Sequence, residues 1–375
     1  MSDHQDEPEA LDLDQVAPPS MEARRALALA EAMAVLDRYS PPMLFLFAFA
    51  LRLAAATNVH FPGLDDPAYY YQVATNLASG RGLTVDTIWG WLVDFPSVTH
   101  ASNEHWMPLA SMVLAPFFAL FGPNFQLGQL VGAAAGAALA PIAWHLSREA
   151  LRDHAPWRAF GWFAGMFIAF NPSLAYQAIA VDSSVYFTLF GALALLLAVT
   201  WLVESNVGAA VTGLVVGLAY LSRTEGLLLA AVLLPVVWLQ TEREAKLRRT
   251  LIFAAGVVVL VLPWWFRNLM AFGSPSPVPL GLLALVPDYA ALFHFGGPAR
   301  EGFAQAGVFD LMGERLQALG QNVSLVLQIT VPLVITAIVA VVRLWDTLAL
   351  RVMLAATVVL VVAPALLVPV LDQWG

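Results

Sequence analysis

The sequence predicts an all-α polytopic membrane protein, and three observations lead to this fold class. First, 59% of its 375 residues are hydrophobic, 12% are charged and the mean hydropathy is +0.72, whereas about a quarter of the residues of soluble domains are charged. Second, the apolar residues form many runs of about 15 to 22 residues, the length of transmembrane helices. Third, the runs lack the alternating pattern of a transmembrane barrel.

Charge and cysteine content exclude several classes of function. Most of the net charge of −9 comes from residues 1–38, which hold nine acidic residues and three arginines. The rest of the chain is nearly balanced, so no nucleic-acid-binding surface is expected. The absence of cysteine excludes disulfides, thiol nucleophiles and thiolate metal sites. The acidic N-terminus lacks the pattern of a signal peptide, so we expect no cleavage.

The N-terminal part of the chain changes character several times. Residues 1–20 are polar and acidic, which predicts a disordered tail. Residues 21–38 are rich in alanine at helical spacing and predict a helix on the cytoplasmic surface. Ser40-Pro41-Pro42 then opens a first span at 43–57. The polar and aromatic stretch 58–106 is far longer than an ordinary connection, which indicates a functional loop.

Nine further apolar segments follow, and the positively charged connections between them indicate their orientation. The segments run over 107–121, 125–145, 159–176, 183–203, 207–221, 226–239, 251–266, 322–342 and 352–370. Clustered arginine and lysine favour the cytoplasmic side of a membrane. Such clusters occur at Arg24/Arg25/Arg38, Arg148/Arg152/Arg158, Arg243/Lys246/Arg248/Arg249 and Arg343/Arg351.

All four positively charged clusters lie on the cytoplasmic side only if one early segment does not cross the membrane. Segment 107–121 is the candidate, because its fifteen residues rise only about 22 Å against a hydrocarbon core of about 30 Å. We therefore expect nine spans plus one short helix that dips into the outer leaflet, with a cytoplasmic N-terminus. The long loops 58–106 and 268–321 then lie on the outer face.

This topology gathers scattered polar groups at one membrane surface, where ionisable residues are by default candidates for function. The groups are Asp65, Asp66, Glu104, His105, Asp182, Arg223, Glu225 and Arg267.

The adjacent acids Asp65 and Asp66 precede a proline and three tyrosines, Tyr69 to Tyr71. Asp66 followed by Pro67 predicts the start of a helix that Gly80 ends. A helix cap explains Asp66 and leaves Asp65 free. A free carboxylate in this position is suited to act as a general base toward an acceptor hydroxyl.

Three other acidic or imidazole groups have both a structural and a functional interpretation. Glu104 and His105 open the dipping segment, where they either bind a cation or a phosphate or form an interfacial cap. Two protein ligands are too few to predict a metal site. Asp182 lies between two spans and is either the cap of the second span or a further reactive acid.

The arginines of the outer face are equally open to two interpretations. Arg223 and Glu225 in a tight turn form either a functional site or a mutual ion pair. Arg267 is an interfacial anchor or a phosphate contact, and Arg52 either snorkels outward or pairs with an acid. The sequence has no Walker loop, dinucleotide fingerprint, nucleophile elbow or His-Glu-x-x-His. ATP-driven transport, redox chemistry and zinc proteolysis therefore lose support.

Five stretches between residues 40 and 280 occur in an order that is typical of one family. They are Asp65-Asp66-Pro67-Ala68-Tyr69 continued by Asn76-Leu77-Ala78-Ser79-Gly80-Arg81-Gly82-Leu83, then His105-Trp106-Met107-Pro108-Leu109, Asp182, Gly217-Leu218-Ala219-Tyr220-Leu221-Ser222-Arg223-Thr224-Glu225-Gly226, and Pro263-Trp264-Trp265-Phe266-Arg267-Asn268 with Phe272-Gly273-Ser274-Pro275. Together they resemble the membrane glycosyltransferases of the GT-C fold. The most similar groups are the protein O-mannosyltransferase and lipid A aminoarabinose transferase superfamily and its RgtA/B/C/D-like prokaryotic relatives. Met107 stands where the family has the first of two prolines.

The resemblance implies a GT-C-type helical bundle over residues 40–375, behind a cytoplasmic tail and surface helix at 1–38. It implies transfer of a sugar, with inversion, from a polyprenyl-phosphate donor to an acceptor hydroxyl at the outer face of the plasma membrane. The acceptor is a lipid, a polysaccharide or a protein, and no cofactor is implied beyond an optional divalent metal. The implied roles are catalysis for Asp65 (the base), Asp66 and Asp182, donor-phosphate binding for Arg223, Arg267 and His105, and the substrate loop for Tyr69, Tyr70 and Glu104.

Two alternatives remain beside the enzyme. A secondary transporter or lipid flippase places its substrate near the bilayer midplane, often on broken helices in repeated halves. Here the middles of the predicted spans are almost free of charge, and the polar groups gather at one surface, which favours interfacial chemistry. The other alternative is an inactive or structural member of the family.

Overall fold

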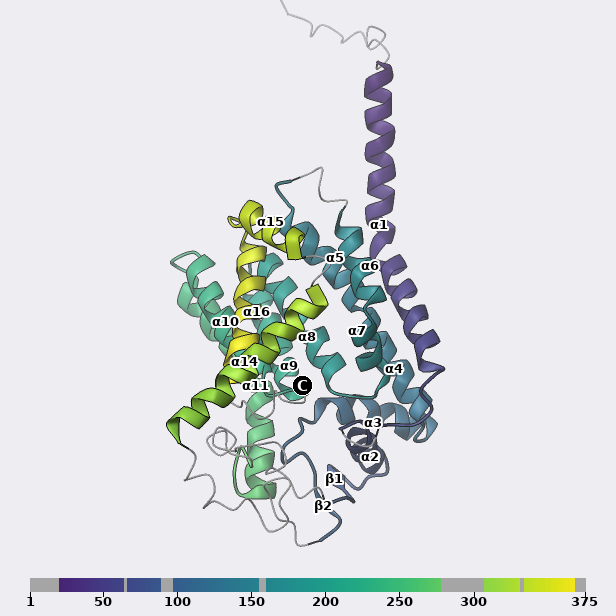
Figure 1. Ribbon diagram of the computed structural model, residues 1–375, viewed down its shortest axis with the longest axis vertical. Helices are drawn as coiled ribbons and strands as arrows, with labels where there is room; N and C mark the ends of the chain where they lie inside the picture. Colours follow the sequence, from purple (N-terminus) through teal and green to yellow (C-terminus); the bar gives the residue numbers. More distant parts are fainter. Residues whose placement is uncertain are drawn as a thin grey trace, which may run out of the picture.

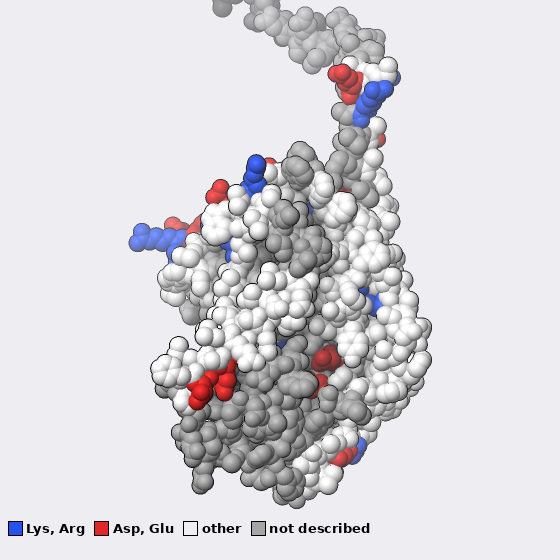
Figure 2. Space-filling model, in the orientation of Figure 1, with Lys and Arg blue, Asp and Glu red and all other residues white. Residues whose placement is uncertain are grey.

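The computed structural model describes residues 20–63, 66–88, 97–154, 160–277, 307–330 and 334–367, and this part of the chain is almost entirely helical (Figure 1). Four of the described helical segments are long and apolar enough to cross a membrane, or five if one bent pair counts as a span. They are Asp37–Ala56, Phe125–Ala150, Lys246–Phe272, Leu348–Leu367 and the pair Pro172–Ile179 with Ser184–Thr200. On the face shown in Figure 2, few of the described side chains are charged. The prediction of an all-α membrane protein is thereby confirmed.

Helix α1, Met21–Ala56, replaces the expected surface helix and separate first span. It runs through Ser40-Pro41-Pro42 without a break, so its 36 residues extend about 54 Å. Proline removes a helix hydrogen bond, but neighbouring helices stabilise such positions in membrane proteins. Here Trp162 Nε1 donates to the Oγ of buried Ser40 at 2.8 Å. The N-terminal half of α1 projects from the bundle (Figure 1).

The first loop is folded, and it starts as predicted. Its elements are α2 (Asp66–Ala78), β1 (Thr84–Val85), β2 (His100–Ala101) and α3 (Leu109–Phe121). Helix α2 begins at Asp66 and ends before Gly80, whose φ of 79° favours glycine. Strands β1 and β2 form a short antiparallel pair, with Thr84 opposite Ala101. Helix α3, the predicted dip, is among the shorter apolar helices.

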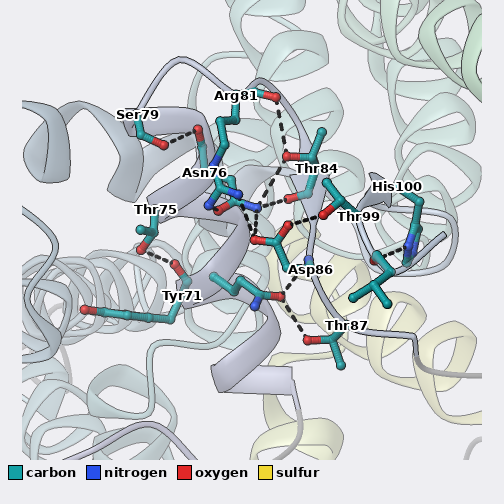
Figure 3. Close-up of polar contacts among 12 residues, drawn as sticks. Tyr71, Thr75, Asn76, Ser79, Arg81, Thr84, Asp86, Thr87, Thr99 and His100 are labelled. Carbon is teal, nitrogen blue, oxygen red and sulfur yellow. Dashed lines mark hydrogen bonds and ion pairs between the residues drawn. The ribbon is translucent and has the colours of Figure 1, made fainter.

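A polar network, which we call the Asp86 latch, fastens this loop (Figure 3). It consists of Asn76, Arg81, Asp86 and Thr99. The Asp86 carboxylate accepts from Arg81 Nη1 at 2.9 Å, Asn76 Nδ2 at 3.2 Å and Thr99 Oγ1 at 2.8 Å. Asn76 also donates to the Thr84 carbonyl at 3.0 Å, which ties the end of α2 to β1. The latch therefore fixes the path of the chain between α2 and α3.

The remaining helices pack into one bundle. They are α4 (Phe125–Ala137), α5 (Leu139–Ala150), α6 (Gly161–Phe170), α7 (Pro172–Ile179), α8 (Ser184–Thr200), α9 (Asn206–Ser222), α10 (Gly226–Gln240) and α11 (Lys246–Phe272). Helix α9 contacts α8, α10 and α11. A Cβ atom at Gly213 of α9 would lie 2.2 Å from the Phe253 carbonyl oxygen of α11, so only glycine permits this approach.

Arg52 of α1 is fully buried in this bundle. It neither reaches the surface nor pairs with an acid of the described residues, so both expectations for it are wrong. Its Nη1 donates to the Ala48 carbonyl at 3.1 Å and its Nη2 to the Ile168 carbonyl of α6 at 3.4 Å. Four residues after Ile168 stands Pro172, which has no amide hydrogen to donate. Arg52 therefore supplies the donor that is missing where α6 gives way to α7.

The C-terminal part differs from the predicted segments in two places. The outer loop expected to begin at Asn268 starts later, because α11 continues through Arg267 to Phe272 and ends at Gly273 with φ 72°. It also ends earlier, because α14 (Val308–Thr330) starts inside the expected loop. Residues 278–306 lie outside the described part of the chain. The segment expected at 322–342 is divided between α14 and α15 (Val334–Leu344), before α16 (Leu348–Leu367).

Candidate functional site

The candidate general base lies outside the described residues, since Asp65 and the preceding Leu64 are not among them. Its neighbour Asp66 is the first residue of α2, as the predicted helix start requires. The other predicted site residues are described. They are Tyr69, Tyr70, Glu104, His105, Asp182, Arg223 and Arg267.

Asp182 occupies the turn between α7 and α8, two helices that are bent by 119° relative to each other. Its Oδ1 accepts from the amide and the hydroxyl of Ser183, and its Oδ2 accepts from Ser184 Oγ at 3.1 Å. The preceding Val181 has φ 66°, a conformation in which a β-branched residue is a genuine outlier. Such strained backbone conformations cluster at functional sites.

Arg223 and Glu225 form the turn between α9 and α10. Arg223 Nη2 and Glu225 Oε1 are 3.1 Å apart, so the predicted ion pair exists. Arg223 Nη1 also donates to Ser184 Oγ at 3.5 Å, which links this turn to the Asp182 turn. The Glu225 carboxylate raises the pKa of Arg223 above its ordinary value. Only glycine fits at Gly226, where a Cβ atom would lie 2.2 Å from the Tyr220 amide nitrogen.

Tyr70 of α2 lies near the Asp182 turn, and the charges of Asp182, Asp66 and Arg223 all act on it. Its side chain is buried, and its hydroxyl is hydrogen-bonded to the side chain of Ser183. Burial and the nearby charges of Asp182 and Asp66 raise the pKa of Tyr70 well above its ordinary value. The hydroxyl therefore remains protonated between two carboxylates.

His105 belongs to the same group, because the charges of Glu225 and Arg223 act on it. Burial lowers the pKa of His105 to about 4, so its imidazole is neutral at physiological pH. We call the set Asp66, Tyr70, His105, Asp182, Arg223 and Glu225 the Arg223 cluster. Its members come from α2, from the loop before α3 and from the α7–α8 and α9–α10 turns.

A second group contains Tyr69 and Glu104, which directly precede Tyr70 in α2 and His105 in the loop. Tyr69 Oη donates to Glu104 Oε2 at 3.3 Å and accepts from the Asn103 amide at 2.5 Å. Burial raises the pKa of Glu104 to about 7. Asn103 has φ 66°, and its Nδ2 donates to the Trp106 carbonyl at 3.0 Å.

Arg267 of α11 completes this second group. Its guanidinium lies 5.0 Å from the ring centroid of Trp264 and 5.1 Å from that of Phe272. Its Nη2 donates to the Leu83 carbonyl at 3.2 Å, and its charge acts on Glu104. We call Tyr69, Asn103, Glu104 and Arg267 the Glu104 cluster.

Residues that are adjacent in the sequence are divided between the two clusters. Tyr69 and Glu104 belong to one cluster, whereas their neighbours Tyr70 and His105 belong to the other. The structure thus brings the described members of the predicted site together, but Arg267 lies with Glu104 rather than with Arg223. Sequence reasoning missed Ser183 and Ser184, for which the Asp182-Ser183-Ser184 run was the available signal.

The described residues contain no group of three or more histidine, aspartate or glutamate side chains that could hold a metal ion. Acidic side chains are visible near the middle of the face shown in Figure 2, beside the undescribed residues. The site is therefore a set of carboxylates, tyrosines and arginines at one end of a membrane bundle. Comparisons with protein-family models, with curated proteins and with solved structures find no match to this chain.

Proposed function

We propose that this protein is a membrane glycosyltransferase that moves a sugar from a polyprenyl-phosphate donor to an acceptor hydroxyl, with Asp65 as the general base. The observation that carries the proposal is the Arg223 cluster. Acids, a neutral histidine and an arginine from elements far apart in the sequence converge beside α2. Such a convergence of charge and perturbed pKa values is typical of a functional site.

The cluster contains the groups that this reaction needs. Departure of a phosphate leaves negative charge, which a fixed arginine stabilises. Arg223 is held in place by Glu225 and Ser184. The acceptor oxygen bonds to the anomeric carbon while the bond from that carbon to the phosphate oxygen breaks, and the acceptor proton passes to Asp65. Attack from the side opposite the phosphate inverts the anomeric centre.

An apolar groove supports the choice of a lipid-linked donor. Its volume is about 590 Å³, and it lies between α1, α3 and α4. The lining residues are Phe49, Phe117, Phe121, Leu127, Leu130, Val131 and Ala134. Helix α3, which borders the groove, begins at Leu109, four positions after His105. A hydrocarbon chain along this groove would lie beside the helix that leads to the site.

The finer topology belongs to the same proposal. It comprises nine spans and the dipping α3, with the Arg223 cluster at the outer face of the plasma membrane and the N-terminus in the cytoplasm. The positively charged connections support this orientation. Labelling of single introduced cysteines is direct in this cysteine-free chain. Labelling at position 182 from the cytoplasmic side would rule out the outer-face site.

The test of the activity is Asp65→Asn. A strain that lacks the gene is complemented with wild type, Asp65→Asn or the control Asp153→Asn, and its surface glycans and glycolipids are compared by mass spectrometry. Asp153 is an exposed acid in the connection after α5, away from the cluster. We expect Asp65→Asn to insert and fold but to restore no product, because amide nitrogen does not accept a proton as carboxylate does. Normal products from Asp65→Asn would overturn the proposal.

A further inference from the structure

The Glu104 carboxylate has one oxygen that is satisfied and one that is not. Oε2 accepts from Tyr69 Oη at 3.3 Å. Oε1 is buried and has no hydrogen-bond partner among the described residues, and Glu104 as a whole is only 3% exposed. A buried acceptor without a donor costs about 1–3 kcal/mol. Groups left in this state within a native fold call for a physical explanation.

Arg267 and the loop of Glu104 meet at one carbonyl group, because Arg267 Nη2 and the Ser102 amide both donate to the Leu83 carbonyl, at 3.2 and 3.0 Å. The charge of Arg267 acts on Glu104, but the two side chains form no ion pair within 4.0 Å. Two of the guanidinium hydrogens are used, by the Leu83 carbonyl at 3.2 Å and by Asn268 Oδ1 at 3.1 Å. Because a guanidinium has five N–H donors, others remain for a further acceptor.

Contacts of the neighbouring residues hold Glu104 in a rigid position. Asn103 adopts φ 66° and is held by bonds from Ser102 Oγ at 2.8 Å and to the Trp106 carbonyl. The ring of Tyr69 packs against that of Trp106, with centroids 4.4 Å apart and planes tilted by 34°. The unsatisfied oxygen is thus fixed by its surroundings, as a preorganised binding group requires.

We propose that Glu104 and Arg267 form a subsite for one hydroxyl group of a neutral, polyhydroxylated ligand, which donates to Glu104 Oε1 and accepts from Arg267. Only a group that both donates and accepts satisfies the two partners. A phosphate is repelled by Glu104 above the pKa of that side chain, where it is ionised, and an ammonium is repelled by the guanidinium. The inference rests on the proposed function, in which the ligand is the sugar of the donor or of the acceptor. It moves Arg267 from phosphate binding to sugar binding and leaves the phosphate to the Arg223 cluster.

Two lipid probes separate sugar recognition from phosphate recognition. Binding of polyprenyl phosphate and of polyprenyl-phosphate hexose to the full chain in nanodiscs is measured for wild type, Glu104→Met and the control Asp86→Asn. Methionine keeps the length of the side chain but removes the acceptor. We expect Glu104→Met to weaken the hexose probe about tenfold and to leave the sugar-free probe within about twofold. Asp86→Asn should leave both affinities within about twofold, because its carboxylate is fully used by the latch.

If Glu104→Met weakened the binding of both probes equally, or of neither, the subsite would be overturned. Glu104 would then bind a water molecule or have a structural role. A second measurement does not depend on the lipid. The infrared band of the protonated Glu104 carboxyl is identified as the band absent from Glu104→Gln. It should shift on saturation with at least one methyl hexoside and stay unchanged with betaine, which has no hydroxyl. A band that no hydroxylated probe moves overturns the subsite, whereas failure of the wild type to bind either lipid overturns the proposed function alone.

Discussion

Two carboxylates of the first loop, Asp86 and Glu104, have opposite surroundings. Asp86 is partly exposed and accepts three side-chain hydrogen bonds, from Arg81, Asn76 and Thr99 (Figure 3). Glu104 is buried and accepts one, from Tyr69. The hydrogen bond from Thr99 is the first of several that lower the pKa of Asp86, whereas burial raises the pKa of Glu104 to about 7.

The difference separates a structural carboxylate from a candidate binding group. Every oxygen of Asp86 has a donor from its own loop, so the latch has nothing left to offer a ligand. Oε1 of Glu104 is buried away from water, and no described residue donates a hydrogen bond to it. Another molecule can complete such a group, and in the proposed subsite that molecule is a sugar. Under the proposed subsite, Asp86 has a structural role and Glu104 has a binding role in the same loop.

The largest expected effect comes from Glu104→Gln and concerns the pH dependence of stability. The folded pKa is about 7 and the ordinary value is 4.5, so the folded state keeps a proton that the unfolded state releases between these values. This contribution to stability is complete below the ordinary value and is lost as the pH rises toward the folded one. The full change is about 3 kcal/mol. Glutamine cannot ionise, so the variant should lack this loss.

Thermal midpoints in detergent between about pH 4.5 and pH 8 measure the effect. Wild type should become less stable relative to Glu104→Gln as the pH rises and should level off above the folded pKa. The two curves should meet at the acid end, where both side chains are neutral. Parallel curves would show that Glu104 is ionised in the fold, and the contrast with Asp86 would disappear.

A smaller effect is expected from Asn76→Ala, which breaks the latch. Asn76 is only 1% exposed and donates to the Thr84 carbonyl and to Asp86. Its removal leaves a strand carbonyl and a carboxylate short of donors, so we expect a loss of about 2 kcal/mol. Chemical unfolding in detergent measures it. A loss that depended on pH as that of Glu104 does would contradict the assignment of a purely structural role.

Parts of this loop were predictable because they depend on local sequence. Asp66 followed by Pro67 predicts the start of α2, and Gly80 predicts its end, since both signals act through their own backbone conformation. The ion pair of Arg223 and Glu225 was likewise predictable, because its partners are only two positions apart. Asp65, the proposed base, lies outside the described residues and stays a prediction.

The features of the fold and the site that the sequence did not predict depend on contacts between distant residues. Tyr69 and Glu104 are 35 positions apart, and no local pattern assigns Tyr69 to Glu104 and Tyr70 to Asp182. Helix α1 runs through its proline pair because helices far along the chain hold it. Arg52 has a backbone carbonyl 116 positions away as its acceptor, where sequence reasoning expected water or an acid. Partner choice of this kind is a property of packing.

The smallest expected effect comes from Thr99→Val. It tests how much one of the three side-chain donors contributes to holding the Asp86 carboxylate. Valine keeps the β-branched shape but loses the hydroxyl that donates to Asp86 Oδ1 at 2.8 Å. Thr99 is exposed, so water replaces the lost donor, and we expect a thermal midpoint within about 2 °C of wild type. The pKa of Asp86 should rise, since Thr99 is the largest cause of its lowering. Carbon-13 titration of the Asp86 carboxyl measures this, and an unchanged pKa would mean that Arg81 and Asn76 alone hold the carboxylate. Because the folded pKa of Asp86 is lowered, the stability that it provides is present at neutral pH and lost in acid, opposite in direction to that of Glu104.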